Sequence, residues 1–189
     1  SGSTLDAHTI EIGPNGFLGG TGTIVGDITN YGIVAPGNSP GTLTIDGSFV
    51  NAAGGRILLE VESNGAGGFN TDQLIFAQGS TIDLAGVEFR FQFLGGTDPN
   101  AFKASGLFDI DTFMKQQTAA GTVPLDASEY AGTTFSAQSD AYVFQSFSFD
   151  AISGATFVAA PVPEPSQWAL MIAGVLFVGG LRRLRRENA

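Results

Sequence analysis

Histidine and cysteine, which enzymes often use for proton transfer and nucleophilic attack near neutral pH, are scarce in this chain. His8 is the only histidine, and there is no cysteine. Ser39 lies in the stretch Gly-Asn-Ser-Pro-Gly, which superficially matches the G-x-S-x-G pattern of hydrolases, but no helix-forming segment follows it, as a nucleophile elbow requires. We therefore predict a loop at Ser39, no catalytic residues and no enzymatic activity.

Two pairs of carboxylates are the remaining candidates for chemistry: Glu60 with Glu62, and Asp109 with Asp111. Residues two apart on a strand share a face, so each pair could polarise a carboxyl group or hold a hard cation such as Ca²⁺. The D-x-D-x-D-G pattern of calcium loops is missing, which favours solvated surface positions, and we predict no bound metal and no cofactor. A carbohydrate-active enzyme using Asp109 and Asp111 is the least favoured alternative. The glycine-rich residues 19–22 precede a strand and not a helix, so phosphate binding is not expected.

The distribution of charge argues against one class of partner. Residues 1–163 carry four basic and sixteen acidic side chains, so this part of the chain would repel the phosphate backbone of nucleic acids. The 27 glycines, and the 16 phenylalanines against one tryptophan, indicate a β-rich structure with aromatic packing. The other four basic residues lie within the last eight positions and form a separate feature.

Short strands are the elements that must position these residues. From His8 to Phe93, short apolar or β-branched runs, several with period-two alternation, are separated by glycine, asparagine, aspartate and proline. The runs follow one another more closely than the strands of a sandwich usually do. This spacing favours a solenoid, in which each coil stacks on its neighbour. An ordinary β-sandwich with short strands is the alternative.

One segment adds a resemblance to a known family. Residues 30–43 read Asn-Tyr-Gly-Ile-Val-Ala-Pro-Gly-Asn-Ser-Pro-Gly-Thr-Leu, and residues 26–47 resemble the repeat G-N-x-x-N-x-G-x-x-x-P-G-N-S-P-G-T-L-x-x-x-G of autotransporter passenger domains. The resemblance implies a right-handed parallel β-helix, with residues 35–41 as the loop between two coils. We therefore expect residues 1–93 to form an all-β, right-handed parallel β-helix or solenoid-like body.

Residues 94–160 are richer in phenylalanine and have longer polar gaps. Residues 142–149 alternate as a half-buried strand should. Residues 111–119 are expected to form one short helix that ends before Gly121 and Pro124. We predict that this part of the chain continues the β body as further coils or closes it as a β cap, because an open coil end would expose unpaired backbone.

Residues 161–189 have the composition of a membrane anchor. Residues 161–165 form a stiff, proline-rich spacer, and residues 168–181 are uncharged. A hydrophobic helix over residues 166–184 would be about 28 Å long, against the ~30 Å of a bilayer's hydrocarbon core. The predicted span contains Trp168, Leu170, Met171, Ile172, Val175, Leu176, Phe177, Val178 and Leu181, and the predicted cytoplasmic anchor consists of Arg182, Arg183, Arg185 and Arg186.

The same tail closely resembles a known sorting signal. Residues 162–171 read Val-Pro-Glu-Pro-Ser-Gln-Trp-Ala-Leu-Met, and together with the span and the arginine cluster they are similar to the PEP-CTERM signal. The resemblance implies export by a signal peptide, which we expect to be removed ahead of Ser1, then retention in the inner membrane and processing by an exosortase-type enzyme. Its recognition residues would be Val162, Pro163, Glu164 and Pro165. An uncleaved single-span anchor is the alternative.

These features predict an exported, non-enzymatic protein of the Gram-negative cell surface or extracellular matrix. A structural role, as a self-assembling fibre or surface subunit, is favoured, and a polysaccharide-binding adhesin module is the alternative. The expected partners are the exosortase-type enzyme, membrane lipid, exopolysaccharide and further copies of the chain, but not nucleic acid. Rows of exposed aromatic and carboxylate side chains on one face would favour the binding module, and an inert polar face would favour the structural role.

Overall fold

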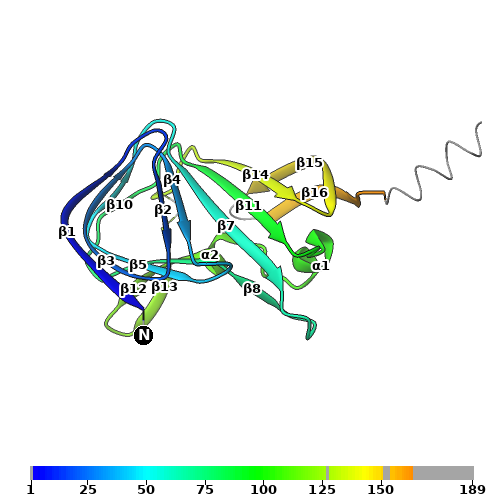
Figure 1. The fold of residues 1–189 in the computed structure, drawn as a ribbon, viewed down its shortest axis with the longest axis horizontal. Helices are drawn as coiled ribbons and strands as arrows, with labels where there is room; N and C mark the ends of the chain where they lie inside the picture. Colours follow the sequence, from blue (N-terminus) through cyan, green and yellow to red (C-terminus); the bar gives the residue numbers. More distant parts are fainter. Residues whose placement is uncertain (1, 127, 151–153, 164–189) are drawn as a thin grey trace, which may run out of the picture.

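The computed structural model describes residues 2–126, 128–150 and 154–163. In these residues the chain is mostly β, with two short helices, and its sheets form a curled half-barrel (Figure 1). Three predicted features lie outside the described residues: the sorting-motif residues Glu164 and Pro165, the span over residues 168–181 and the arginine anchor over residues 182–186. In the described part of the chain, no helix is long and apolar enough to cross a membrane.

Two mainly parallel sheets make up the body. We name them sheet A and sheet B. Sheet A contains β1 (Ser3–Ile12), β3 (Gly22–Asn30), β5 (Thr42–Asp46), β6 (Phe49–Asn51), β9 (Gln73–Phe76), β10 (Ile82–Asp83), β12 (Met114–Thr118) and β13 (Gly121–Pro124). Sheet B contains β2 (Phe17–Gly20), β4 (Ile33–Pro36), β7 (Arg56–Ser63), β8 (Phe69–Thr71), β11 (Glu88–Leu94) and β14 (Thr134–Ser139). Only the β12–β13 and β7–β8 pairs within these sheets are antiparallel.

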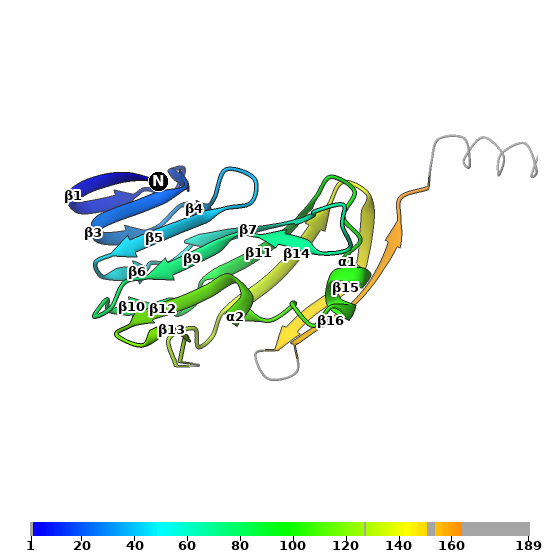
Figure 2. The ribbon, with the colours of Figure 1, turned by 90° about the horizontal axis from the view of Figure 1, so that it is seen from below.

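The chain passes back and forth between the two sheets. It runs from β1 in sheet A to β2 in sheet B, returns to β3 in sheet A and continues to β4 in sheet B, and this alternation recurs as far as β14. Except for β8 and β13, each new strand lies parallel to an earlier strand of the same sheet, so the strands follow one another along the molecule (Figure 2). The prediction of a mostly β chain is confirmed, and its sheets are mainly parallel.

The core lies between the sheets and is built by strict alternation. On β7 the side chains of Ile57, Leu59 and Val61 are fully buried, while the residues between them face outward. The register places Phe89, Phe91 and Phe93 of β11 directly beside these three residues, in that order. Burying each such side chain contributes about 1.5–3 kcal/mol. The stacked rows therefore fix the register, because a slip of one residue would turn every core side chain outward.

Two asparagines mark the ends of two adjacent sheet A strands. Asn30 at the end of β3 is aligned with Asn51 at the end of β6, and both are buried. The Asn30 Nδ2 group donates to Asn51 Oδ1 over 3.0 Å, and the Asn30 Oδ1 atom accepts the Gly32 N–H over 3.0 Å. The stacked amides thus satisfy polar groups at the turn where the chain leaves sheet A for sheet B.

The helix predicted over residues 111–119 is mostly wrong. Helix α2 (Ile110–Phe113) is a single turn, and residues 114–118 form β12, which pairs with β9. Met114 is fully buried beside Leu74. These residues therefore form a strand near the edge of sheet A, because pairing with β9 buries Met114 in the core. Helix α1 (Pro99–Ala104) was not predicted, although Asp98 as N-cap and Pro99 at the first position are typical of a helix start.

The last strands form a separate antiparallel hairpin, β15 (Tyr142–Asp150) with β16 (Gly154–Pro161). Aromatic rings hold it against sheet B: the ring centroids of Phe135 on β14 and Phe149 on β15 lie 4.5 Å apart. Phe108 contacts Phe157 of β16 in the same cluster. Residues 94–160 therefore contain both strands that extend the two main sheets and this separate hairpin.

A candidate binding face on sheet B

The outward side chains of sheet B lie in register across its strands. The strand order β14-β11-β7-β4-β2 and the parallel register align them in rows. The first row contains Phe17, Ile33, Arg56, Glu88 and Thr134; the second contains Leu58, Arg90 and Ser136; the third contains Glu60, Gln92 and Gln138. This face therefore carries an exposed aromatic ring, two aliphatic side chains, two arginines and two carboxylates among polar residues.

Three hollows lie on this face. A small central hollow of about 70 Å³ is lined by Ile33, Arg56, Leu58, Arg90 and Gln138. A hollow of about 350 Å³ lies over the β2 and β4 side and is lined by residues that include Phe17, Asn38, Ser39, Leu58 and Glu60. A third, of about 260 Å³, lies at the ends of β11 and β14 and is lined by residues that include Gln92, Gln138 and Asp140.

The three hollows lie side by side across sheet B, and we call them together the sheet B groove. Leu58 lines both the central hollow and the one near Phe17, and Gln138 lines both the central hollow and the one near Asp140. The groove therefore crosses the strands from β14 to β2, and its outer hollows are much larger than its centre. An elongated ligand fits such a shape better than a compact one.

The central hollow is held by a network of charges. Glu88 accepts the Arg56 Nε–H over 2.9 Å, and its other oxygen accepts from a terminal nitrogen of Arg90 over 3.0 Å and from the Ser136 hydroxyl over 3.1 Å. Partial burial acts to raise the pKa of Glu88, but its hydrogen bonds and the two positive charges outweigh burial and hold this pKa below its ordinary value. Glu88 is therefore ionised at neutral pH and fixes both guanidinium groups.

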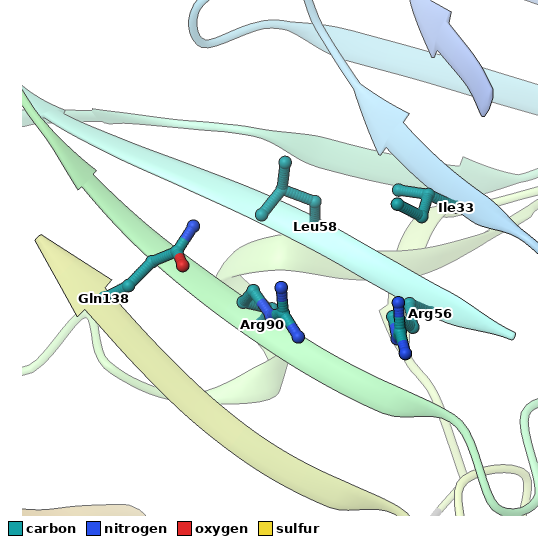
Figure 3. A pocket seen from close by; sticks show the side chains of 5 residues that line it. All are labelled: Ile33, Arg56, Leu58, Arg90 and Gln138. Atoms are coloured by element: carbon teal, nitrogen blue, oxygen red, sulfur yellow. The ribbon is translucent and has the colours of Figure 1, made fainter. Parts of the chain in front are cut away.

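Both arginines keep donors for a ligand. Each guanidinium has five N–H groups, and Glu88 takes one nitrogen from each. Among the contacts of the described residues, the other guanidinium N–H groups have no acceptor in the protein. Figure 3 shows the two side chains next to each other on β7 and β11, on the same face as Leu58 and Gln138. The central hollow thus combines positive charge with an apolar side chain and an amide.

This concentration of positive charge contrasts with the rest of residues 1–163. Arg56 and Arg90 are two of the four basic residues there. The other two lie on different elements: Lys103 on α1, above the Phe157 ring, and Lys115 on β12 of sheet A. The acidic body therefore gathers half of its positive side chains at one small hollow.

Asp72 supports the loop beside the groove, and the sequence reasoning missed it. Its side chain is fully buried, and its two oxygens accept the Gly41 N–H and the Glu60 N–H, each over 2.8 Å. Burial raises the pKa of Asp72 to about 7, the charge of Glu60 adds to this, and the two hydrogen bonds oppose it. Asp72 therefore links the loop over residues 36–41 to β7. A signal was present, since Asp72 directly precedes the apolar strand β9.

The predicted carboxylate pairs differ in their surroundings. Glu60 lines the groove, and its pKa is raised first by burial and then by the charge of Glu62. Asp109 and Asp111 do not share a strand, contrary to the sequence argument. Asp109 is the N-cap of α2 and accepts the Thr112 N–H over 2.8 Å. Burial and the charge of Asp109 raise the pKa of Asp111, while Lys115 acts to lower it.

The other residues singled out from the sequence lie apart from the groove or at its rim. His8 is exposed on β1. Ser39 lies in the loop at the groove's rim, with a positive φ of 63°, and β5 and not a helix follows it. No group of three histidine, aspartate or glutamate side chains that could hold a metal ion occurs in the part of the chain that the structure describes.

The predicted sorting motif begins where the described chain ends. Val162 follows β16, is 46% exposed, and donates its N–H to the Ala141 carbonyl over 2.8 Å. Pro163 is the last described residue. The start of the motif is thus attached to the body by one backbone hydrogen bond and lies at its surface.

Comparisons with models of protein families, with curated proteins and with solved structures found no significant match.

Proposed function

We propose that this chain is an exported structural protein of the bacterial cell surface or extracellular matrix, delivered by its C-terminal sorting signal. The observation that carries the proposal is the succession of Val-Pro-Glu-Pro, an uncharged stretch and an arginine cluster in residues 162–186. The exposed position of Val162 supports it, because a processing enzyme must reach the motif without unfolding the body. In this proposal the predicted span holds the chain in the inner membrane until an exosortase-type enzyme acts.

The delivery step is tested with the full chain in a Gram-negative host that has an exosortase-type enzyme. Mass spectrometry of the mature C-terminus should find cleavage near residues 163–165 in the wild-type chain. The Glu164→Ala variant should keep its tail and stay in the inner-membrane fraction, whereas Glu187→Ala, which changes the same residue type beyond the arginines, should be processed normally. An intact tail in all three chains would instead favour a plain, uncleaved anchor.

We further propose that the body is a right-handed parallel β-solenoid closed by a β cap. Support comes from the alternation of the chain between sheets A and B, from the parallel register of successive strands and from the stacked Asn30 and Asn51. Parallel strands joined by a crossover connection are almost always right-handed. The β15–β16 hairpin would serve as the cap, since it covers the aromatic side chains at the end of the core.

The free edge of β1 is a surface through which copies of this chain could assemble. Among the described residues, β1 pairs only with β3, so its other edge presents backbone N–H and C=O groups. Leu5 is aligned with the buried Ile24 but is itself 50% exposed, and Phe17 on β2, the edge strand of sheet B, is 67% exposed. An exposed edge with apolar side chains is a template for another strand. In this proposal a second copy of the chain covers it.

Polysaccharide binding is a second candidate function, and the sheet B groove is the observation that favours it. Extended grooves that combine an exposed ring, apolar patches and amide or charged groups suit elongated polar ligands. The face is not inert, because it carries Phe17, Glu60, Gln92 and both arginines in adjacent rows. Titration of the full chain with oligosaccharides tests this function directly.

A further inference from the structure

We infer that the sheet B groove selects an acidic heteropolysaccharide, and that its central hollow binds one carboxylate between Arg56 and Arg90. The neighbouring sugars of this polymer, which occupy the two outer hollows, would be uncharged. This inference rests on the polysaccharide-binding function proposed above and specifies the chemical class of its ligand.

The central hollow has the chemistry of a carboxylate site. Two guanidinium groups present N–H donors that Glu88 does not use, and planar guanidinium groups match carboxylates with paired, charge-assisted hydrogen bonds. Because Glu88 holds both arginines, little side-chain entropy would be lost when the ligand binds. With two arginines and one glutamate, the hollow keeps one net positive charge for an anionic group.

The volume of each hollow indicates which part of the polysaccharide it would bind. About 70 Å³ in the centre is far below the ~300–1,000 Å³ of pockets that enclose whole small molecules, so the centre accepts a projecting group and not a complete ring. The outer hollows, of about 350 and 260 Å³, are on the scale of single sugar rings. Phe17 offers a ring face for stacking on one side, and Gln92 and Gln138 offer amides on the other.

The charges of the outer hollows explain why the neighbouring sugars should be neutral. Glu60 lines one outer hollow and Asp140 lines the other. A carboxylate placed in either would face a like charge, whereas a neutral sugar can donate hydroxyl groups to these acceptors. The groove thus has a positive centre flanked by negative sites, which disfavours a polymer that is charged at every residue.

The test uses the full chain in a mild detergent and three oligosaccharides of equal length. The first has one glucuronate flanked by neutral hexoses, the second is the same molecule with its carboxyl group reduced to an alcohol, and the third is an oligouronate. Calorimetric titration should show tightest binding to the first, with a loss of about ten- to a hundred-fold for the reduced form, the range expected when a charge-assisted hydrogen bond is lost. The oligouronate should also bind more weakly than the first.

Variants locate the effect. Arg90→Gln should weaken binding of the first oligosaccharide by about ten-fold or more, and Arg90→Lys should restore only part of it, because lysine keeps the charge but not the planar fork. Gln138→Ala should weaken binding of all three ligands. Lys115→Gln, which removes the same charge from sheet A, should change nothing. The reduced oligosaccharide tests the same contact without altering the protein, in case an arginine variant is unstable.

The outcomes separate the two proposals. Equal binding of the reduced and unreduced oligosaccharides would overturn the carboxylate site but leave polysaccharide binding in place. Tighter binding of the oligouronate would overturn the assignment of neutral outer sugars. If none of the three binds, both the inference and the polysaccharide-binding function fall, while delivery by the sorting signal is unaffected.

Discussion

At the scale of single residues, Asp72 is a carboxyl group in a position that penalises its own charge. It is fully buried between the loop over residues 36–41 and β7, and it binds the Gly41 and Glu60 N–H groups. These two hydrogen bonds favour the ionised form, but burial outweighs them and raises its pKa to about 7. The side chain therefore titrates close to neutral pH while it joins the loop to the sheet.

We predict that Asp72 makes the protein more stable as the pH falls from about 7.5 to 5.5. The pKa of Asp72 is about 7 in the folded state, against an ordinary value of 3.8 for aspartate, so in this window the folded state takes up a proton that the unfolded state does not. Proton uptake by the folded state raises the free energy of unfolding as the pH falls. Urea unfolding at both pH values measures the change.

The Asp72→Asn variant is the control for this pH dependence. It keeps an oxygen acceptor but does not titrate, so its free energy of unfolding should vary less between the two pH values. Glu60 and Asp111, whose pKa values are also raised, and Glu88, whose pKa is lowered, contribute to both proteins. If the free energy of unfolding changed equally with pH in the wild type and in Asp72→Asn, Asp72 would not be the titrating group.

At the scale of the element, β7 places core residues on one face and groove residues on the other. Along β7, Ile57, Leu59 and Val61 fill the core, and Arg56, Leu58 and Glu60 form the groove. Packing on the inner face therefore sets the register that aligns the groove residues outside. The buried apolar rows on the inner face hold the strands in register, and the same register aligns the charged residues on the outer face.

Leu59 and Leu58 should respond very differently to truncation. Leu59→Ala removes a fully buried side chain beside Phe91 and should lower the free energy of unfolding by about 2–5 kcal/mol. Leu58→Ala, on the next residue but the outer face, should cost about 1 kcal/mol or less. Chemical unfolding of both variants measures the difference, and equal losses would contradict the assignment of faces.

At the scale of the whole molecule, the two ends of the body differ. The β15–β16 hairpin packs phenylalanine rings over one end. At the other end the edge of β1 carries Leu5, which continues the core row of Ile24, Ile45 and Phe76 but is half exposed. A contact through two β1 edges would be self-complementary and closed, whereas filaments require two different surfaces. The proposed self-assembly should therefore give dimers first.

Leu5→Lys should disrupt this assembly. A charged side chain that points toward the junction of two core rows opposes edge pairing. In sedimentation experiments on the full chain, the wild type should form dimers and the variant monomers. Val158→Lys, an equally exposed change on the hairpin, should leave the dimer intact. A monomeric wild type, or a dimer that tolerates lysine at position 5, would contradict the proposed contact.

Period-two alternation is a local property, so the sequence alone determined the mostly β fold and the two faces of strands such as β7 and β11. The helix predicted from local sequence was wrong at residues 114–118, because pairing with β9 of sheet A and the burial of Met114 favour a strand there. Local reasoning also missed the burial of Asp72, which depends on two distant segments.

The groove was decided by tertiary structure alone. Arg56, Arg90 and Gln138 come from three different strands, separated by long stretches of chain, and nothing near any one of them in the sequence indicates the others. They share a hollow because the strand order and the parallel register place β7, β11 and β14 side by side. That order follows from how the buried rows of the whole body pack together, and no local pattern of residues encodes it.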